Sequence, residues 1–143
     1  MSEYQLDEET HNKVRKFCAQ GDQFLDAKRY DDALKQYNMA WALVPDPKEE
    51  WEASTWILAA IGDTCWLGSN SAEAQNAFDF ALTCPSGLGN PFIHLRLGQI
   101  HFDSNNLERA ADELTRAYMG AGMEIFGDAD PKYFEFLRTR ISI

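Results

Sequence analysis

The amino-acid sequence predicts an all-α fold built from a repeated pair of helices. Three observations support this: apolar residues recur every three or four positions, capping residues mark helix starts, and one pattern of small and large side chains occurs three times. No stretch alternates between apolar and polar residues for long enough to make a strand. We therefore expect about seven helices joined by short connections.

The first two expected helices carry apolar residues at helical spacing. One run consists of Val14, Phe17, Cys18, Gly21, Phe24 and Leu25, and the next of Ala33, Leu34, Tyr37, Ala40 and Trp41. Residues 28–30 form a short connection between the two runs. Each run predicts a helix with one apolar face that packs against a neighbour.

Later helix starts are marked by a capping residue followed by proline. Proline lacks the N–H group that the first helical turn leaves unpaired, so it fits there without loss. The pair occurs at Asp46-Pro47, Asn90-Pro91 and Asp130-Pro131. A glutamate three residues after the capping residue, close to capping-box spacing, occurs at Asp46 with Glu49, Asn70 with Glu73, and Asn105 with Glu108. Each of these positions is expected to start a helix.

One pattern of small and large residues occurs in three copies. The copies are Gly21, Ala33, Tyr37 and Ala40; Gly62, Ala74, Phe78 and Ala81; and Gly98, Ala110, Leu114 and Ala117. The small residues allow two helices to cross closely, and the large residue fills the space between them. Such a helix pair has only one buried face and must stack on its neighbours, so the pattern predicts a helical solenoid.

This pattern resembles the tetratricopeptide repeat (TPR) family, whose 34-residue unit is a pair of antiparallel helices that stack into a right-handed superhelix. The resemblance covers about residues 14–124. Gly21 and Gly62 are 41 residues apart, which is longer than the family period. We therefore expect residues 46–54 to lengthen the first helix of the second repeat by two turns.

The resemblance implies one TPR-like domain over residues 1–143, with three helix-turn-helix repeats and a C-terminal capping helix. The repeats are expected at about 14–47, 48–88 and 90–124, and the capping helix at about 130–140. Tyr133, Phe134 and Leu137 give this last helix an apolar side, as the end of a solenoid requires.

The chain is strongly acidic, with 13 Lys and Arg against 23 Asp and Glu and a formal net charge of -10. This charge disfavours nucleic-acid and membrane-surface binding and favours a basic protein partner. No apolar run is long enough to span a membrane, and the N-terminal residues 1–9 do not resemble a signal peptide. The three cysteines, Cys18, Cys65 and Cys84, form no CxxC pair and are interpreted as small core residues. We therefore expect a cytoplasmic protein.

Catalytic and cofactor motifs are missing from the sequence. There is no nucleophile elbow, phosphate-binding loop, dinucleotide fingerprint or zinc-protease motif. His94 and His101 lie seven residues apart, but no carboxylate or thiolate ligand accompanies them at close spacing, so each is interpreted as a core histidine with a hydrogen-bond partner. We expect no enzyme activity, no cofactor and no metal.

The TPR resemblance implies that the first helix of each pair lines a concave groove. The repeat pattern places these residues in it: Arg15, Cys18, Asp22, Leu25, Asp26, Trp56, Asp63, Trp66, Phe92, Gln99, Phe102 and Asp103. Such a groove is acidic with an aromatic floor, which suits a basic segment with apolar or aromatic anchors. The alternative interpretation is that the aromatic residues pack between helix pairs and the aspartates form a solvated face.

Some TPR proteins bind C-terminal carboxylates through basic residues and asparagine in this groove. The matching positions here hold Cys18, Asp22, Ala60, Phe92 and Arg96, of which only one is basic. A receptor for an anionic tail is therefore not expected.

Acidity, small size and an aromatic groove favour an immunity protein that binds and neutralises a basic, nuclease-type bacterial toxin domain. The segment from Asn90 to Arg96 and the tail from Ala117 to Phe134 also resemble small bacterial repeat proteins found beside polymorphic toxins. The alternatives are a TPR-type secretion chaperone and a scaffold or adaptor that binds an extended segment. Trp51 and Trp56 lie near one end of the expected solenoid, which makes that end a candidate homodimer surface.

Overall fold

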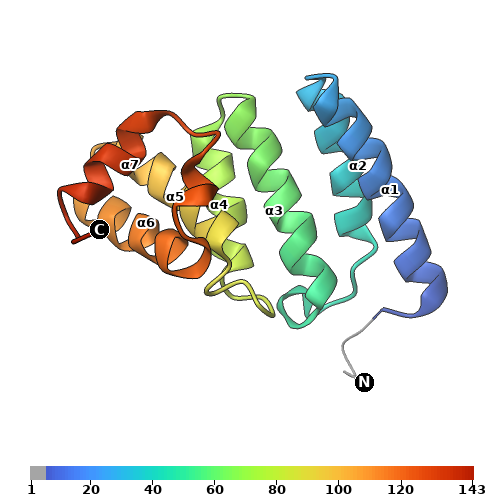
Figure 1. Ribbon diagram of the computed structural model, residues 1–143. Helices are drawn as coiled ribbons and strands as arrows, with labels where there is room; N and C mark the ends of the chain where they lie inside the picture. The colour runs from blue at the N-terminus through green and yellow to red at the C-terminus, as the bar shows by residue number, and fades with distance from the viewer. Residues whose placement is uncertain (1–5) are drawn as a thin grey trace. The chain divides into compact units, whose positions relative to one another are not determined.

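The computed structural model describes residues 6–143, and the all-α prediction is confirmed because these residues contain no strand. Residues 1–5, part of the segment inspected for a signal peptide, lie outside the described residues. The α-helices are α1 (Glu8–Asp26), α2 (Tyr30–Ala42), α3 (Glu52–Leu67), α4 (Ser71–Ala81), α5 (Pro91–Asp103), α6 (Leu107–Ala121) and α7 (Pro131–Arg138) (Figure 1). Two short 3-10 helices, η1 (Lys48–Glu50) and η2 (Met123–Phe126), lie in the connections. No helix among residues 6–143 is both long and apolar enough to cross a membrane.

The chain divides into two compact units, of which the first ends at Leu88 and the second begins at Gly89. Unit 1 contains α1 packed on α2 and α3 packed on α4, and α2 also contacts α3. Unit 2 contains α5 packed on α6, followed by η2 and α7. This order, three helix pairs followed by a final helix, is the predicted one. A single domain over residues 1–143 stays a prediction.

The repeated glycines lie where the two helices of a pair cross. A Cβ atom at Gly21 would lie 2.6 Å from the Tyr37 ring, and one at Gly62 would lie 2.7 Å from the Phe78 ring. At Gly98 the nearest atom would be the Cδ2 methyl of Leu114, at 2.5 Å. The predicted close crossing is therefore confirmed in all three pairs, and the large residue packs directly over the glycine.

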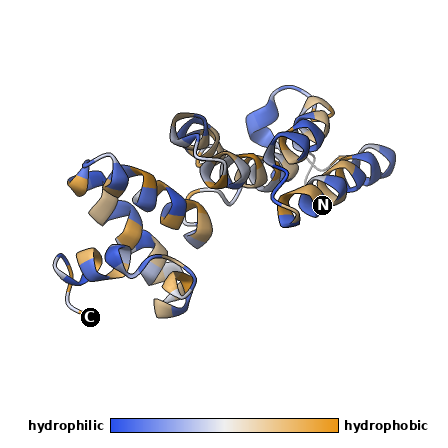
Figure 2. Ribbon diagram, turned by 90° about the horizontal axis from the view of Figure 1, so that it is seen from above, coloured by the Kyte–Doolittle hydropathy of each residue, from blue (hydrophilic) through white to orange (hydrophobic). Residues whose placement is uncertain are grey.

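The alanines of the pattern are fully buried. Their exposed fraction is 0% at Ala33, Ala40, Ala74, Ala81, Ala110 and Ala117. One apolar cluster in unit 1 includes Val14, Tyr37 and Ile57, and one in unit 2 includes Leu114 and Leu137. Helix α1 accordingly carries hydrophobic and hydrophilic residues on different sides (Figure 2).

Three of the predicted helix starts are confirmed. Asn90 accepts hydrogen bonds from the backbone N–H groups of Phe92 and Ile93 at the start of α5. Asp130 accepts one from Lys132 at 3.0 Å, and Asn70 accepts one from the N–H of Glu73 at 3.3 Å. Each side chain pairs one or more of the N–H groups that a first turn leaves without a partner.

The predicted helix start at Asp46 is wrong. Pro47 and Trp51 have extended backbone, only η1 forms between them, and α3 begins at Glu52. The side chain of Lys48 donates hydrogen bonds to the carbonyl oxygens of Trp41 (2.7 Å) and Val44 (2.6 Å), at the end of α2. The carbonyl oxygen of Lys48 in turn accepts a hydrogen bond from Ser54 Oγ at 2.5 Å. These contacts hold the extra residues as a connection, so they do not lengthen the helix by two turns.

The predicted capping role of Asn105 is also wrong. Its φ of 64° places it in the left-handed region of the turn, and Asn106 occupies the capping position before α6. The turn that joins α5 to α6 needs a residue with positive φ, which asparagine tolerates better than most residues.

Candidate functional site

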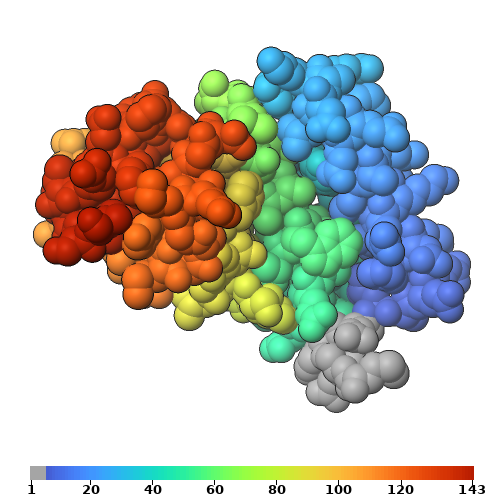
Figure 3. Space-filling view, viewed as in Figure 1, coloured from blue at the N-terminus to red at the C-terminus, as the bar shows by residue number. Residues whose placement is uncertain are grey.

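Unit 1 contains a cavity of about 580 Å³ between α1 and α3, with α2 at its floor. The surface is visibly hollowed between these two helices in Figure 3. Its lining consists of His11, Arg15, Cys18, Ala19 and Asp22 from α1, Tyr37 from α2, and Trp56 and Ala60 from α3. Four of the predicted groove residues, Arg15, Cys18, Asp22 and Trp56, are therefore brought together.

Helical periodicity explains this grouping. Successive lining residues of α1 are three or four positions apart or adjacent, so they share one face of the helix. Trp56 and Ala60 are four positions apart on α3, so a large indole and a small methyl group line the cavity from the same face of that helix. Trp56 is 39% exposed, which leaves much of its ring accessible to a partner.

Asp22 is the acidic group of the cavity, and Tyr37 holds its side chain in place. The Tyr37 hydroxyl donates a hydrogen bond to Asp22 Oδ1 at 2.5 Å. Burial and this bond to a carboxylate raise the pKa of Tyr37 above its usual value, so the phenol stays protonated at neutral pH. Asp22 itself is exposed, so its negative charge is presented to solvent from a fixed position.

Cys18 forms part of the cavity wall and is 8% exposed. Burial, together with the nearby Asp22 carboxylate, raises the pKa of the Cys18 thiol to about 11. The thiol is therefore protonated at neutral pH, unlike a reactive cysteine. Cys65 and Cys84 are also buried, which agrees with the interpretation of all three as core residues.

The other predicted residues of unit 1 do not line the cavity. Leu25 is half-buried and packs against the apolar cluster of the unit, whereas Asp26 is exposed near the end of α1. Asp63 and Trp66 are half-buried on α3. Asp26 and Asp63 thus add acidic groups to the two helices that form the cavity walls.

In unit 2 the predicted groove residues Phe102 and Asp103 are in contact with α7. The ring of Phe102 meets that of Tyr133 edge to face, with 5.4 Å between centroids, and lies 5.1 Å from that of Phe136. The Tyr133 hydroxyl donates to the Asp103 carboxylate at 2.9 and 3.0 Å, and Lys132 Nζ lies 3.4 Å from Asp103 Oδ1. The acidic and aromatic groups of this unit are therefore satisfied from within the unit.

Phe92 and Gln99, the remaining predicted residues, are linked through Arg96. The Arg96 guanidinium lies over the Phe92 ring at 5.2 Å and donates from Nη1 to Gln99 Oε1 at 2.9 Å. Gln99 is only 2% exposed, so its amide is a buried group.

A buried polar network in unit 2 surrounds His94. Its Nε2 accepts a hydrogen bond from the N–H of Gly89 at 2.8 Å, so Nδ1 carries the proton and donates to Glu113 Oε2 at 2.6 Å. Arg109 Nε donates to the other oxygen of Glu113 at 3.0 Å. His94 is thus a core histidine with both ring nitrogens satisfied, as predicted.

Sequence reasoning missed Glu113. It lies between Ala110 and Ala117 on the buried face of α6. Its spacing of three and four residues from these alanines could have indicated that it is buried. Among residues 6–143, no group of three His, Cys, Asp or Glu side chains is placed to hold a metal ion.

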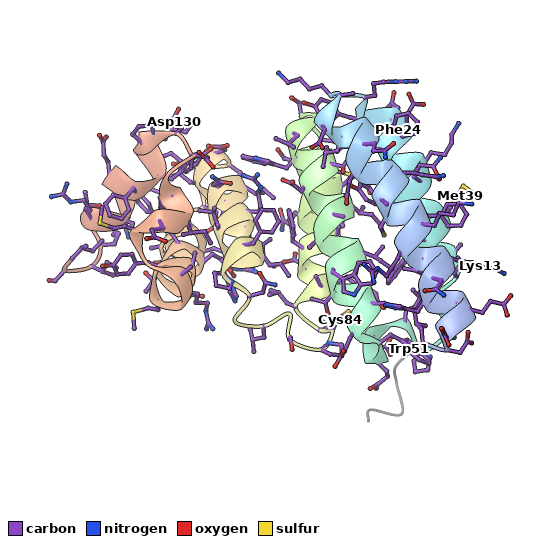
Figure 4. The ribbon with its side chains drawn as sticks, turned by 45° about the vertical axis from the view of Figure 1, so that its right-hand side comes forward. Lys13, Phe24, Met39, Trp51, Cys84 and Asp130 are labelled. Carbon is purple, nitrogen blue, oxygen red and sulfur yellow. The ribbon has the colours of Figure 1, made fainter. Side chains whose placement is uncertain are left out.

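Trp51, the other residue named for a homodimer surface, is half-buried against the apolar cluster of unit 1 (Figure 4). Homodimerisation through Trp51 and Trp56 stays a prediction.

No protein-family model and no curated protein matches the chain. Two solved structures are similar to it, each over 90% of this chain and 92% of the other. One is the first TPR of Spaghetti (RPAP3) bound to the HSP90 peptide SRMEEVD, with 16% identity and a TM-score of 0.68. The other is the Yersinia enterocolitica type III secretion chaperone SycD in complex with a peptide of the translocator YopD, with 12% identity and a TM-score of 0.70. The chain therefore has a TPR-like fold of three helix-turn-helix pairs and a capping helix.

Proposed function

We propose that this chain is a non-catalytic module that binds a segment of a protein partner carrying basic residues. The observation that carries the proposal is the cavity of unit 1, where the exposed carboxylate of Asp22 and the exposed indole of Trp56 share one opening. An aromatic ring beside a fixed charge is a common anchor arrangement in protein interfaces.

The acidic surroundings of the cavity support a basic segment. Asp26 and Asp63 lie on the same two helices as Asp22 and Trp56, and the chain carries a formal net charge of -10. Such a field speeds the encounter with a basic partner and disfavours anionic ones.

Unit 1 is the better candidate for partner binding than unit 2. In unit 2 the acidic and aromatic groups Asp103 and Phe102 contact Lys132 and Tyr133 of α7. Lys132 already offsets part of the Asp103 charge, so a partner cation gains less there than at Asp22, which makes no ion pair within residues 6–143.

We propose neutralisation of a basic, nuclease-type toxin domain as the physiological setting. The excess of acidic groups suits occlusion of a cationic nuclease site, which itself binds a polyanion. In this setting the bound partner is a folded domain that dissociates slowly.

A secretion chaperone or adaptor is the second candidate. A cavity of about 580 Å³ accommodates a few side chains of one extended segment, and the similar chaperone SycD was solved with a translocator peptide. In this setting the partner is held partly unfolded and released readily.

Charge variants test the proposed site. Affinity capture from the native cell at low and moderate salt should recover a basic partner with the unaltered chain and lose most of it with Asp22→Asn, which keeps an oxygen acceptor for Tyr37. Trp56→Ala should weaken capture as well, because it removes the apolar anchor.

Asp31→Asn is the matched control, because Asp31 is exposed on α2 outside this cavity. Equal loss with Asp31→Asn and Asp22→Asn would contradict the proposed site. Hydrogen exchange of the captured partner then separates the two settings: a protected partner indicates a folded toxin domain, and an unprotected one indicates a chaperone client.

A further inference from the structure

The cavity of unit 1 has two ends of opposite charge. His11 and Arg15 line it toward the start of α1, and Asp22 lines it toward the end of that helix. We infer that the cavity recognises a bipolar segment, in which one acidic and one basic residue flank an apolar side chain. This inference rests on the proposed function and adds the residue pattern of the partner.

Arg15 supplies the positive end. Its side chain is exposed, and within residues 6–143 the structure gives its guanidinium no ion pair. Arginine remains charged at any physiological pH and binds carboxylates in a two-pronged geometry. A partner carboxylate at this end of the cavity therefore gains a strong donor, whereas a second partner cation there meets repulsion.

Asp22 supplies the negative end, and Tyr37 fixes its position through the 2.5 Å hydrogen bond. Asp26 follows one helical turn later and is exposed, so the acidic character continues beyond the cavity. A partner Lys or Arg at this end gains two nearby carboxylates.

The middle of the cavity is apolar. Ala19 and Ala60 provide small walls, and Trp56 provides a large exposed ring beside them. An aliphatic or aromatic side chain between the two charged residues would cover this ring and displace water from it.

The separation of the two ends sets the spacing in the partner. Arg15 and Asp22 are seven residues apart on α1, which corresponds to about 10 Å along a helix axis. An extended segment advances about 3.3 Å per residue and directs only alternate side chains to one side. Its acidic and basic residues should therefore be about four positions apart with the apolar residue midway, and the long side chains of Arg15 and of the partner cation take up the difference in length.

Synthetic peptides test the pattern with the full chain. Fluorescence anisotropy would compare three labelled peptides with identical glycine-serine flanks: one with Asp-Ser-Leu-Ser-Lys, one with Lys-Ser-Leu-Ser-Asp, and one with Lys-Ser-Leu-Ser-Lys. The better of the two bipolar peptides should bind about fivefold more tightly than the doubly basic one, since an exposed ion pair contributes at most about this much.

Charge reversal at Arg15 should invert this preference. With Arg15→Glu, the doubly basic peptide should bind more tightly than either bipolar peptide. Lys16→Glu makes the same change in net charge at the next residue, which is exposed and outside the cavity, and should leave the preference unchanged.

The outcomes separate the inference from the proposed function. If the doubly basic peptide binds most tightly to the unaltered chain and Asp22→Asn weakens it, the bipolar pattern is wrong and the basic-segment proposal stands. If no peptide binds, or if the affinity is unchanged by both Asp22→Asn and Arg15→Glu, the cavity is not the binding site. The bipolar pattern and the basic-segment proposal are then both wrong.

Discussion

Units 1 and 2 carry similar acidic and aromatic residues on the first helices of their pairs, but they use them differently. In unit 1, Asp22 and Trp56 border an open cavity. In unit 2, Lys132 and Tyr133 of α7 contact Asp103 and Phe102, although Asp103 remains exposed. The same kinds of residue can therefore border an open cavity in one unit and contact a later helix of the same chain in the other.

The largest expected effect on stability comes from the buried network of His94 and Glu113 in unit 2. Unit 1 has no counterpart, because among residues 6–143 the only buried carboxylate is that of Glu113, at 3% exposure. His94→Leu should lower the free energy of unfolding by about 3 kcal/mol, because it removes the donor to that carboxylate. Urea denaturation followed by circular dichroism would measure the change.

The double variant His94→Leu with Glu113→Leu serves as the control. It should recover part of the loss, because the buried charge is removed together with its donor. A loss below about 0.5 kcal/mol for His94→Leu alone would show that the network contributes little.

Alanine substitution of one aromatic residue in each unit compares the covered and the open surface. Phe102→Ala should lower the free energy of unfolding by about 2 kcal/mol, because the ring packs against α7. Trp56→Ala should cost a comparable amount, because about three fifths of the Trp56 surface is buried in spite of its exposed part. The two variants should differ in capture of the partner, which Trp56→Ala weakens and Phe102→Ala leaves unchanged. Equal capture by both would contradict the distinction between the two surfaces.

Alanine at the crossing glycines compares the helix pairs. In an ordinary helix this substitution stabilises by about 1 kcal/mol. Gly62→Ala should instead destabilise by about 2 kcal/mol, because the new methyl group would meet the rigid Phe78 ring. Gly98→Ala should cost about as much, because the new methyl group would meet Cδ2 and Cγ of the fully buried Leu114 and would lie 3.2 Å from its backbone nitrogen.

The combination of Gly62→Ala with Phe78→Leu provides a check on the cause. It should cost less than the sum of the two single changes, because the smaller side chain makes room for the methyl group. If the two losses of unfolding free energy simply add, contact between the new methyl group and the Phe78 ring is not the cause of the destabilisation.

The smallest expected effect is shared by the two units and appears at high pH. Burial and a hydrogen bond to an aspartate raise the pKa of both Tyr37 and Tyr133. In the unfolded chain both would ionise near pH 10, so the stability they contribute is present below pH 10 and is lost as the pH rises further. Absorbance at 295 nm should show these two, of five tyrosines in the chain, ionising late.

Phenylalanine variants assign the effect to each unit. Tyr37→Phe and Tyr133→Phe should each lower the free energy of unfolding at neutral pH by about 1 kcal/mol and reduce its decline above pH 10. Tyr118→Phe is the control, because its hydroxyl donates no hydrogen bond to an aspartate within residues 6–143. An unchanged high-pH decline in both test variants would contradict the assignment.

Much of the fold could be predicted because its determinants are local. The interval from Gly21 to Tyr37 matches that from Gly62 to Phe78, and helical geometry turns that interval into a contact. Asn90 caps α5 through N–H groups only two and three residues away.

The failed predictions depended on contacts that local patterns do not contain. Asp46 has the same local signal as Asn90, but the bonds of Lys48 to the end of α2 hold this segment outside the helix. The hydrogen bond between Asp103 and Tyr133 joins residues 30 positions apart, so repeat spacing alone does not reveal this contact. The cavity lining was found in part, because four of its members lie on two predicted helix faces.

Lys48 has a consequence for how such a chain tolerates change. The ammonium group of Lys48 donates hydrogen bonds to two carbonyl oxygens at the end of α2, and its own carbonyl oxygen accepts a hydrogen bond from the Ser54 hydroxyl of α3. The additional residues between α2 and α3 therefore form a connection that these hydrogen bonds hold in place. They lengthen neither helix. With such connections, a repeat protein can gain or lose residues between its helix pairs during evolution while the residues at which its helices cross keep their spacing.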